Sequence, residues 1–256
     1  MQRLSFLCNI KMEVLVKFYN FMKNLEYCCN KKEKRRKYMK RKKFIAICAG
    51  GILLIGCVAG SILYWLNWIP HRKYTNKDFG IETYVSSVDQ DQDGIDDQTD
   101  ILEGCRAYIA TNPKYKSKYY AGGYPDDEYG VCTDVVAFSL LAAGYDLQQL
   151  VAEDIENHRE DYDIKQPDPN IDFRRVRNLR VYFERNAISL TTDITDVEEW
   201  QGGDIIIFEK HIGMVSDKRN KKGVSFLIHN GSPTQVGYEQ DVLEYREDIV
   251  GHYRMN

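Results

Sequence analysis

Three residues in the C-terminal half of the chain have the chemistry needed for catalysis by a sulfur nucleophile. Cys132 stands where a Gly- and Pro-rich stretch gives way to an apolar one that predicts a helix, and His211 and His229 lie at the ends of two consecutive predicted strands. A cysteine nucleophile requires a thiolate, a nearby base and a third group that orients this base. The dipole of a helix N-terminus lowers a thiol pKa. Together the three residues predict a thiol-dependent active site.

Each of these residues also has a simpler interpretation. A single histidine at a strand end is usually a surface or capping residue, so the prediction depends on the three occurring together. Cys105 and Cys132 are the only cysteines after residue 70. Two cysteines do not make a disulfide framework, and both could be small buried apolar residues or form one bridge.

Helices followed by strands must position these residues. Apolar residues at helical spacing predict helices at 100–110, 131–143, 146–156 and 172–186. After Trp200, a Gln-Gly-Gly turn begins a run of predicted strands at 204–209, 212–216, 225–229 and 250–254. Helices first and a mostly antiparallel sheet second define an α+β domain. In an antiparallel pair, His211 and His229 would approach the same end of the sheet.

Four motifs resemble those of the NlpC-type, papain-like cysteine peptidases of bacterial cell walls, over about residues 115–256. They are Tyr120-Ala121-Gly122-Gly123-Tyr124-Pro125, Gly130-Val131-Cys132-Thr133-Asp134-Val135-Val136, Gly202-Gly203-Asp204-Ile205-Ile206-Ile207-Phe208 and His211-Ile212-Gly213-Met214-Val215. Within that superfamily, the chain is most similar to a bacterial branch of unknown function. The features of this branch are Gly-Val-Cys-Thr-Asp, Asp168-Pro169-Asn170-Ile171-Asp172 before Arg174-Arg175-Val176, and a terminal Gly251-His252-Tyr253-Arg254.

The resemblance implies a papain-like fold and a role for each matching residue. Cys132 would be the nucleophile, His211 the general base and His229 the residue that orients it. Tyr120 would be the tyrosine near the oxyanion site. No cofactor is expected for this chemistry.

The motif at the nucleophile departs from the better-studied members, which have Asp-Cys-Ser-Gly where this chain has Val131-Cys132-Thr133-Asp134. In those members, the Asp next to the nucleophile helps to recognise the substrate. The departure therefore weakens any inference about which bond is cut. Asp134 is the acidic residue near Cys132 in this chain, and it is a candidate for substrate binding. Arg174 and Arg175 could bind a substrate carboxylate, or could form an exposed basic helix face in an acidic domain.

An acidic loop precedes the first predicted helix. Residues 89–100 have carboxylates at positions 1, 3, 5, 9 and 12 and a glycine at position 6, which matches the calcium-loop template. The predicted ligands are Asp89, Asp91, Asp93, Ile95 through its carbonyl, Asp97 and Asp100. Position 12 is Asp rather than Glu, and the apolar residue stands at 7 rather than 8. A structural Ca²⁺ is therefore predicted, and the alternative is a solvated acidic linker.

The N-terminal part predicts a membrane anchor. Residues 44–69 include no charged side chain, and a helix of this length rises roughly 39 Å, enough to cross a hydrocarbon core of about 30 Å. Lys31–Lys43 has ten basic residues and one acidic, and such a block stays in the cytoplasm. A cleaved signal peptide would have a shorter apolar core, and a lipoprotein signal at Cys57 would be followed by polar residues. The C-terminal domain is thus expected outside the membrane.

These features divide the chain into a basic cytoplasmic segment 1–43, a transmembrane helix 44–69, a tether 70–88, the calcium loop 89–100 and a hydrolase domain 101–256. Met39 and the basic residues after it are typical of a translation start, so the first 38 residues could precede the true start of the protein. The alternative is that these residues form a membrane-surface helix. Gly56 and Gly60 form a G-x-x-x-G pair that could support a dimer.

Charge and chemistry together predict the function. Residues 70–256 hold 35 acidic and 21 basic side chains, which argues against nucleic acid as a partner. The expected protein is a membrane-anchored cysteine peptidase or amidase outside the cytoplasm, acting on peptidoglycan stem peptides or a related amide. The alternative is a calcium-dependent cell-wall-binding or adhesion module without catalytic activity.

Overall fold

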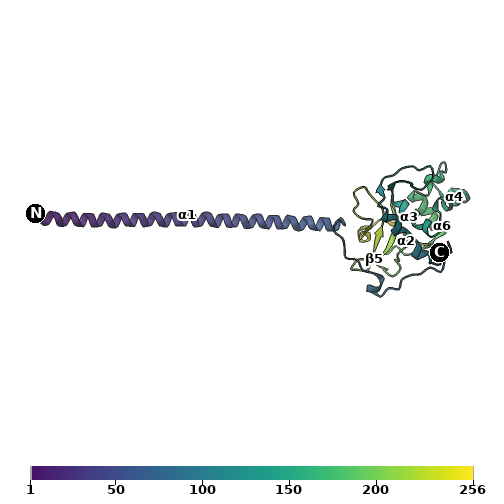
Figure 1. Ribbon diagram of the computed structural model, residues 1–256, viewed down its shortest axis with the longest axis horizontal. Coiled ribbons are helices and arrows are strands. Elements are labelled where there is room, and N and C mark those ends of the chain that lie inside the picture. The colour runs from purple at the N-terminus through teal and green to yellow at the C-terminus, as the bar shows by residue number, and fades with distance from the viewer. Residues whose placement is uncertain (1, 256) are drawn as a thin grey trace. The chain divides into compact units, whose positions relative to one another are not determined.

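The computed structural model describes the backbone of residues 2–255 and the side chains of residues 22–24, 31 and 33–255. The chain divides into two compact units, Met1–Trp65 and Leu66–Asn256. The first unit is one helix, α1 (Gln2–Trp65), and Figure 1 shows it as a single uninterrupted coil. Many side chains of the basic segment 1–43 lie outside the described residues.

Part of α1 is long and apolar enough to cross a membrane. This part is Glu33–Trp65, with a mean hydropathy of 2.3 in its most apolar window, none of which is buried in the protein. The helix ends at Trp65, four residues before the predicted end of the span. Asn67 has a left-handed backbone with φ of 58°, which a helix cannot continue through.

The second unit is built on a six-stranded sheet in which every pairing is antiparallel. The strand order is β3-β8-β4-β5-β6-β7. The four predicted strands are confirmed as β4 (Ile205–Phe208), β5 (Ile212–Arg219), β6 (Ser225–Ile228) and β8 (Ile249–Arg254). The outer strands β3 (Ile188–Ser189) and β7 (Glu239–Gln240) are short. A separate parallel pair joins β1 (Lys114–Tyr115) to β2 (Tyr129–Gly130).

The helices lie where the apolar spacing places them. They are α2 (Asp97–Ala110), α3 (Cys132–Ala142) and α4 (Leu147–Asn157), followed by α5 (Pro169–Asp172) and α6 (Val176–Asn186). The single helix predicted over 172–186 is broken between α5 and α6. Asp168 caps α5 by accepting a hydrogen bond from the amide of Asn170, and Arg175 returns to extended backbone before α6 begins. The mixed helix-and-sheet class is as predicted.

The two faces of the sheet are covered differently. One face packs against α2, α3, α4 and α6 in the main core, to which Ile205, Met214 and Ile228 contribute. The other face holds a smaller core around Trp200, with Ile206 and Leu227 from the strands. Strand residues therefore alternate between two buried faces, which explains why β4 is apolar at every position.

The segment 70–88 differs from the predicted tether because it packs against the domain. Asn76 is buried, and its Oδ1 accepts a hydrogen bond of 2.6 Å from Nε of the fully buried Arg219. Tyr74 adds a β-bridge to the same arginine. A buried guanidinium must have acceptors, and this segment supplies one of them.

Candidate active site

Helix α3 places Cys132 at its first residue. Val131 is the N-cap, and its amide donates to Oδ2 of Asp134 at 2.8 Å. The amides of the first helical residues have no acceptor within the helix. The thiol of Cys132 lies within hydrogen-bonding reach of the amides of Ile212 and Thr133. The sulfur therefore lies at the beginning of β5, and Cys132 and His211 line the same pocket.

The sheet brings His211, His229 and Gln240 together. His211 precedes β5, His229 follows β6, and Nε2 of His211 lies 2.8 Å from Nδ1 of His229. Nε2 of His229 lies 3.0 Å from Oε1 of Gln240 on β7. Gln240 stands opposite Leu227, so it shares a sheet face with His229 two residues along. The predicted approach of the two histidines is observed.

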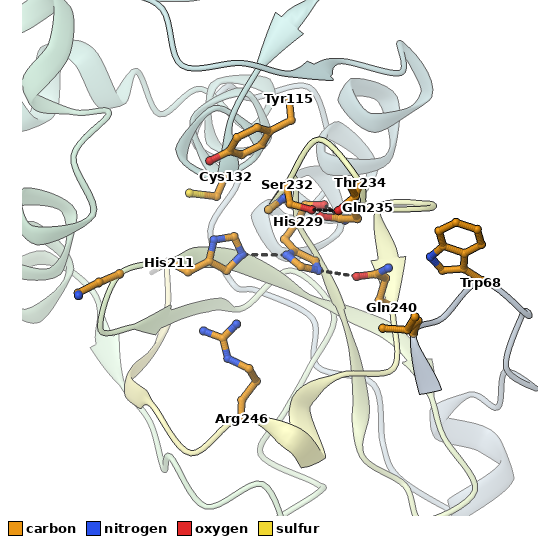
Figure 2. Close-up of a pocket in the computed structure, with 13 residues that line it drawn as sticks. Trp68, Tyr115, Cys132, His211, His229, Ser232, Thr234, Gln235, Gln240 and Arg246 are labelled. Carbon is orange, nitrogen blue, oxygen red and sulfur yellow. Dashed lines mark hydrogen bonds between the residues drawn. The ribbon is translucent and has the colours of Figure 1, made fainter. Parts of the chain in front are cut away.

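The amide of Gln240 determines which nitrogen of each histidine has a proton. Nε2 of Gln240 donates to the carbonyl of Val236 at 3.3 Å, which leaves Oε1 as the acceptor facing His229. His229 must then donate from Nε2 and accept at Nδ1. His211 in turn donates from Nε2, and its Nδ1 has a free lone pair. Figure 2 shows this second nitrogen on the side of the ring away from His229, below Cys132.

Cys132 and the histidine pair line one pocket of about 570 Å³. Figure 2 shows Cys132 and Tyr115 above His211, with Arg246 below it and Trp68 at the far end. The remaining lining residues come mainly from the loop after His229: Gly231, Ser232, Thr234 and Gln235, together with Leu66, Lys210 and Gln240. This loop is held in place because Asn230 donates to the carbonyls of Pro113 and Gly130 at 2.9 and 3.1 Å.

Burial keeps the reacting groups neutral. It raises the pKa of Cys132 to about 11, although the amides of Ile212 and Thr133 act in the opposite direction. Burial and the charge of a protonated His229 lower the pKa of His211 to about 3. Burial also lowers the pKa of His229 to about 4, against the opposing effect of its hydrogen bond to Gln240. The helix N-terminus was expected to favour a thiolate, but desolvation of the sulfur outweighs it.

Tyr115, rather than Tyr120, is the tyrosine at the sulfur. The hydroxyl of Tyr120 donates to Oδ1 of Asp127 at 2.7 Å, and Tyr120 does not line the pocket. Tyr115 lies on β1, and Figure 2 shows its ring beside Cys132. Neither Tyr115 nor Gln240 could be identified from the sequence. Tyr115 is one of several tyrosines before Cys132, and Gln240 lies on a strand too short to leave an alternation pattern.

The predicted substrate-binding residues Arg174 and Asp134 form a buried ion pair. Nε and Nη2 of Arg174 donate to the two carboxylate oxygens of Asp134 at 2.6 and 2.9 Å, and the two side chains are 2% and 0% exposed. A substrate carboxylate cannot reach either of them. Arg175 is 40% exposed and lies 3.6 Å from Asp172. None of the three lines the pocket, where the cations are Lys210 and Arg246.

Three of the predicted calcium ligands lie together, and a fourth is used elsewhere in the structure. Carboxylate oxygens of Asp89, Asp91 and Asp93 lie within 4.8 Å of one another, so this cluster could hold a metal. Asp97 differs from the prediction because its carboxylate is buried and used elsewhere: it accepts from the hydroxyl of Tyr145 and from the amide of Gln90. Asp97 is therefore not available as a direct ligand.

Sheet, helices and pocket define a mixed helix-and-sheet domain with a Cys-His-His-Gln arrangement, in a chain that has one N-terminal helix long and apolar enough to span a membrane. The chain belongs to the family described as Domain of unknown function (DUF1287), whose model matches residues 102–255. It is 38% identical over 168 residues to Uncharacterized protein YijF of Escherichia coli (strain K12), which covers 60% of this chain and 80% of that protein. No solved structure matches the chain. All four residues of the arrangement lie within the family region, and the acidic loop precedes it.

Proposed function

We propose that this protein is a membrane-anchored cysteine hydrolase, a peptidase or amidase that cuts peptidoglycan stem peptides or a related amide. The observation that carries the proposal is the hydrogen-bonded series from Gln240 through His229 to His211, which leaves an unprotonated ring nitrogen beside the Cys132 thiol in an open pocket. A nucleophile, a base and a group that orients the base are the parts that covalent catalysis requires.

Acylation begins from the neutral pair. Nδ1 of His211 accepts the thiol proton as the sulfur of Cys132 attacks the carbonyl carbon of the amide. The amides at the start of α3 would donate to the oxygen that becomes negative. His211, now protonated, gives its proton to the leaving nitrogen, the C–N bond breaks, and a thioester to Cys132 remains.

Deacylation uses the same base. Nδ1 of His211 accepts a proton from water, the resulting hydroxide attacks the thioester, and the sulfur leaves and regains the proton. His229 stabilises the charged ring of His211 at both steps through the bond of 2.8 Å. Its own hydrogen bond to Gln240 keeps the imidazole in the accepting tautomer.

Two features of the pocket support a peptide substrate that has both carboxylates and an apolar part. Lys210 and Arg246 line the pocket and contribute positive charge, although Asp248 forms two hydrogen bonds of 2.7 Å with Arg246. Trp68 offers an apolar surface at one end. Peptidoglycan stem peptides carry several carboxylates, and a cation at the pocket rim favours them.

The order of elements supports a papain-like fold. The nucleophile is the first residue of a helix that packs on an antiparallel sheet, and the base and its orienting residue come later, at the ends of the adjacent strands β5 and β6. This is the arrangement that the motif resemblance implies.

The test of the activity is digestion of purified peptidoglycan by the full-length protein in detergent, with mass spectrometry of the released fragments. Cys132→Ala is expected to abolish release. Cys105→Ala is the matched control, because Cys105 is fully buried away from the pocket and burial raises its pKa to about 12. Release that survives in Cys132→Ala would contradict the proposal.

The rival function is a calcium-dependent wall-binding or adhesion module without catalysis. The elevated thiol pKa is the observation in its favour. The two are distinguished by the same digest: a module of this kind would sediment with peptidoglycan in the presence of calcium and release no fragments.

We also propose that the domain lies outside the cytoplasm, because the basic block Lys31–Lys43 precedes the apolar part of α1. Protease added to intact spheroplasts is expected to digest residues 66–256 and to leave a protected N-terminal fragment. Protection of the domain until the membrane is opened would reverse this orientation.

A further inference from the structure

The acidic loop before α2 concentrates negative charge at one point. The carboxylates of Asp89, Asp91 and Asp93 approach within 4.8 Å of one another. Some of this charge is balanced by amides, since Gly94 donates to Asp89 at 3.0 Å and Ile95 donates to Asp93 at 2.8 Å. Like charges at such separations repel, and a bound cation would remove the repulsion.

Asp100 gives a second and independent indication of a ligand. It lies in the first turn of α2 and is 9% exposed, and its Oδ2 is fully buried with no hydrogen-bond partner. A buried carboxylate oxygen without a partner is costly. Asp100 also stands at position 12 of the loop, where the calcium-loop template places a carboxylate ligand.

We propose that loop 89–100 binds one Ca²⁺, with carboxylate ligands from Asp89, Asp91, Asp93 and Asp100. Calcium favours six to eight oxygen ligands in flexible geometry, whereas magnesium requires a near-ideal octahedron and retains water. The calcium-loop template adds the main-chain carbonyl of Ile95. The site does not depend on the proposed hydrolase activity.

The surroundings indicate what the cation would do. Asp97, buried beside the ligands, accepts from Tyr145, and the loop packs so closely on Gly144 that a Cβ there would lie 3.1 Å from Cβ of Asp91. Gly144 and Tyr145 follow α3, the helix that begins with Cys132. Calcium would therefore stabilise the packing of the start of α2 against the C-terminal end of α3, the helix that begins with Cys132.

The test measures calcium binding to the full-length protein in detergent after treatment with EGTA. Titration calorimetry with CaCl₂ is expected to give one site per chain. Saturating calcium should raise the Tm by about 5 °C or more, because a ligand at 100 times its Kd stabilises the folded state enough for a shift of this size in a domain of about 190 residues. MgCl₂ at the same concentration should have a much smaller effect.

Substitution distinguishes a ligand from a structural carboxylate. Asp100→Asn and Asp93→Asn are each expected to lose the calcium-dependent shift, yet to match or exceed the wild-type Tm in EGTA because they relieve repulsion. Asp126→Asn is the matched control, since this exposed aspartate lies outside the loop. No heat of binding, an equal shift with magnesium, or a calcium response that survives in Asp100→Asn would overturn the proposal.

Discussion

At the scale of single residues, the reactive groups are held neutral and depend on hydrogen bonding for their reactivity. The thiol of Cys132 and the imidazole of His211 have pKa values displaced in opposite directions, to about 11 and about 3. An ion pair of thiolate and imidazolium is therefore disfavoured before substrate binds. Proton transfer must accompany attack, so the tautomer of His211 becomes decisive.

The first prediction concerns the pH dependence of thiol alkylation. Iodoacetamide reacts with the thiolate, so labelling of Cys132 is expected to be slow at pH 7 and to rise as the pH increases towards about 11. Mass spectrometry of the peptide that contains Cys132 measures it separately from the other cysteines. A labelling rate that is already at its plateau at pH 7 would instead indicate a stable ion pair.

The second prediction concerns Gln240 as a positioning residue. Gln240→Leu removes the acceptor at Nε2 of His229, which permits the wrong tautomer. It should lower kcat/KM by about 10-fold or more, out of the 10²- to 10⁴-fold that a general base contributes. Gln240→Glu still accepts from Nε2 and should retain most of the activity, with the acid limb of the pH–rate profile moved to higher pH because a carboxylate favours protonated histidine. Equal losses in both variants, with unchanged profiles, would indicate a merely structural role.

At the scale of elements, the N-terminus of α3 depends on a buried ion pair. Asp134 accepts from the amide of Val131 and from Arg174, and Nη1 of Arg174 donates to the carbonyl of Lys118 at 2.7 Å. The pair joins the loop before Cys132 to the turn between α5 and α6. Its function is to hold the first turn of α3 in place.

The third prediction follows from this pair. Arg174→Ala leaves Asp134 buried without its partner and should lower the free energy of unfolding by about 3–5 kcal/mol. Arg175→Ala, at the exposed neighbour, should change it by about 0.5 kcal/mol or less. Denaturant unfolding of the two full-length variants measures the difference. A small effect of Arg174→Ala on stability, with a large increase in KM, would restore the substrate-binding role.

Apolar spacing and turn residues were sufficient to predict α2, α3, α4 and the four longer strands, and the antiparallel pairing brought His211 and His229 together as expected. Contacts between distant residues were not predictable in this way. Arg174 and Asp134 are 40 positions apart, and either could have been exposed. Gln240 contacts His229 only because a two-residue strand joins the edge of the sheet.

At the scale of the whole molecule, the domain of residues 66–256 includes more chain than the sequence suggested. The segment 70–88 packs through Asn76 on Arg219, and Asn67, just beyond α1, receives a hydrogen bond of 3.1 Å from the amide of Asp241. Such contacts satisfy buried polar groups and have no apolar periodicity by which they could be recognised. Truncation of the domain at residue 89 would therefore remove one of the hydrogen-bond acceptors of the buried Arg219.

The last prediction is the pH dependence of global stability. His211 and His229 have folded-state pKa values of about 3 and about 4, below the ordinary 6.5, so the unfolded chain binds more protons than the folded one between these limits. The contribution of these two histidines to the free energy of unfolding should be fully present above pH 6.5 and should decrease as the pH falls towards 4. The double variant His211→Gln, His229→Gln should flatten this decline in denaturant midpoints of the full-length protein. Cys132→Ala should leave the slope unchanged, because the thiol stays protonated in both states over this range. A wild-type midpoint that is constant from pH 7 to pH 5 would mean that the folded protein does not lower the pKa values of the two imidazoles.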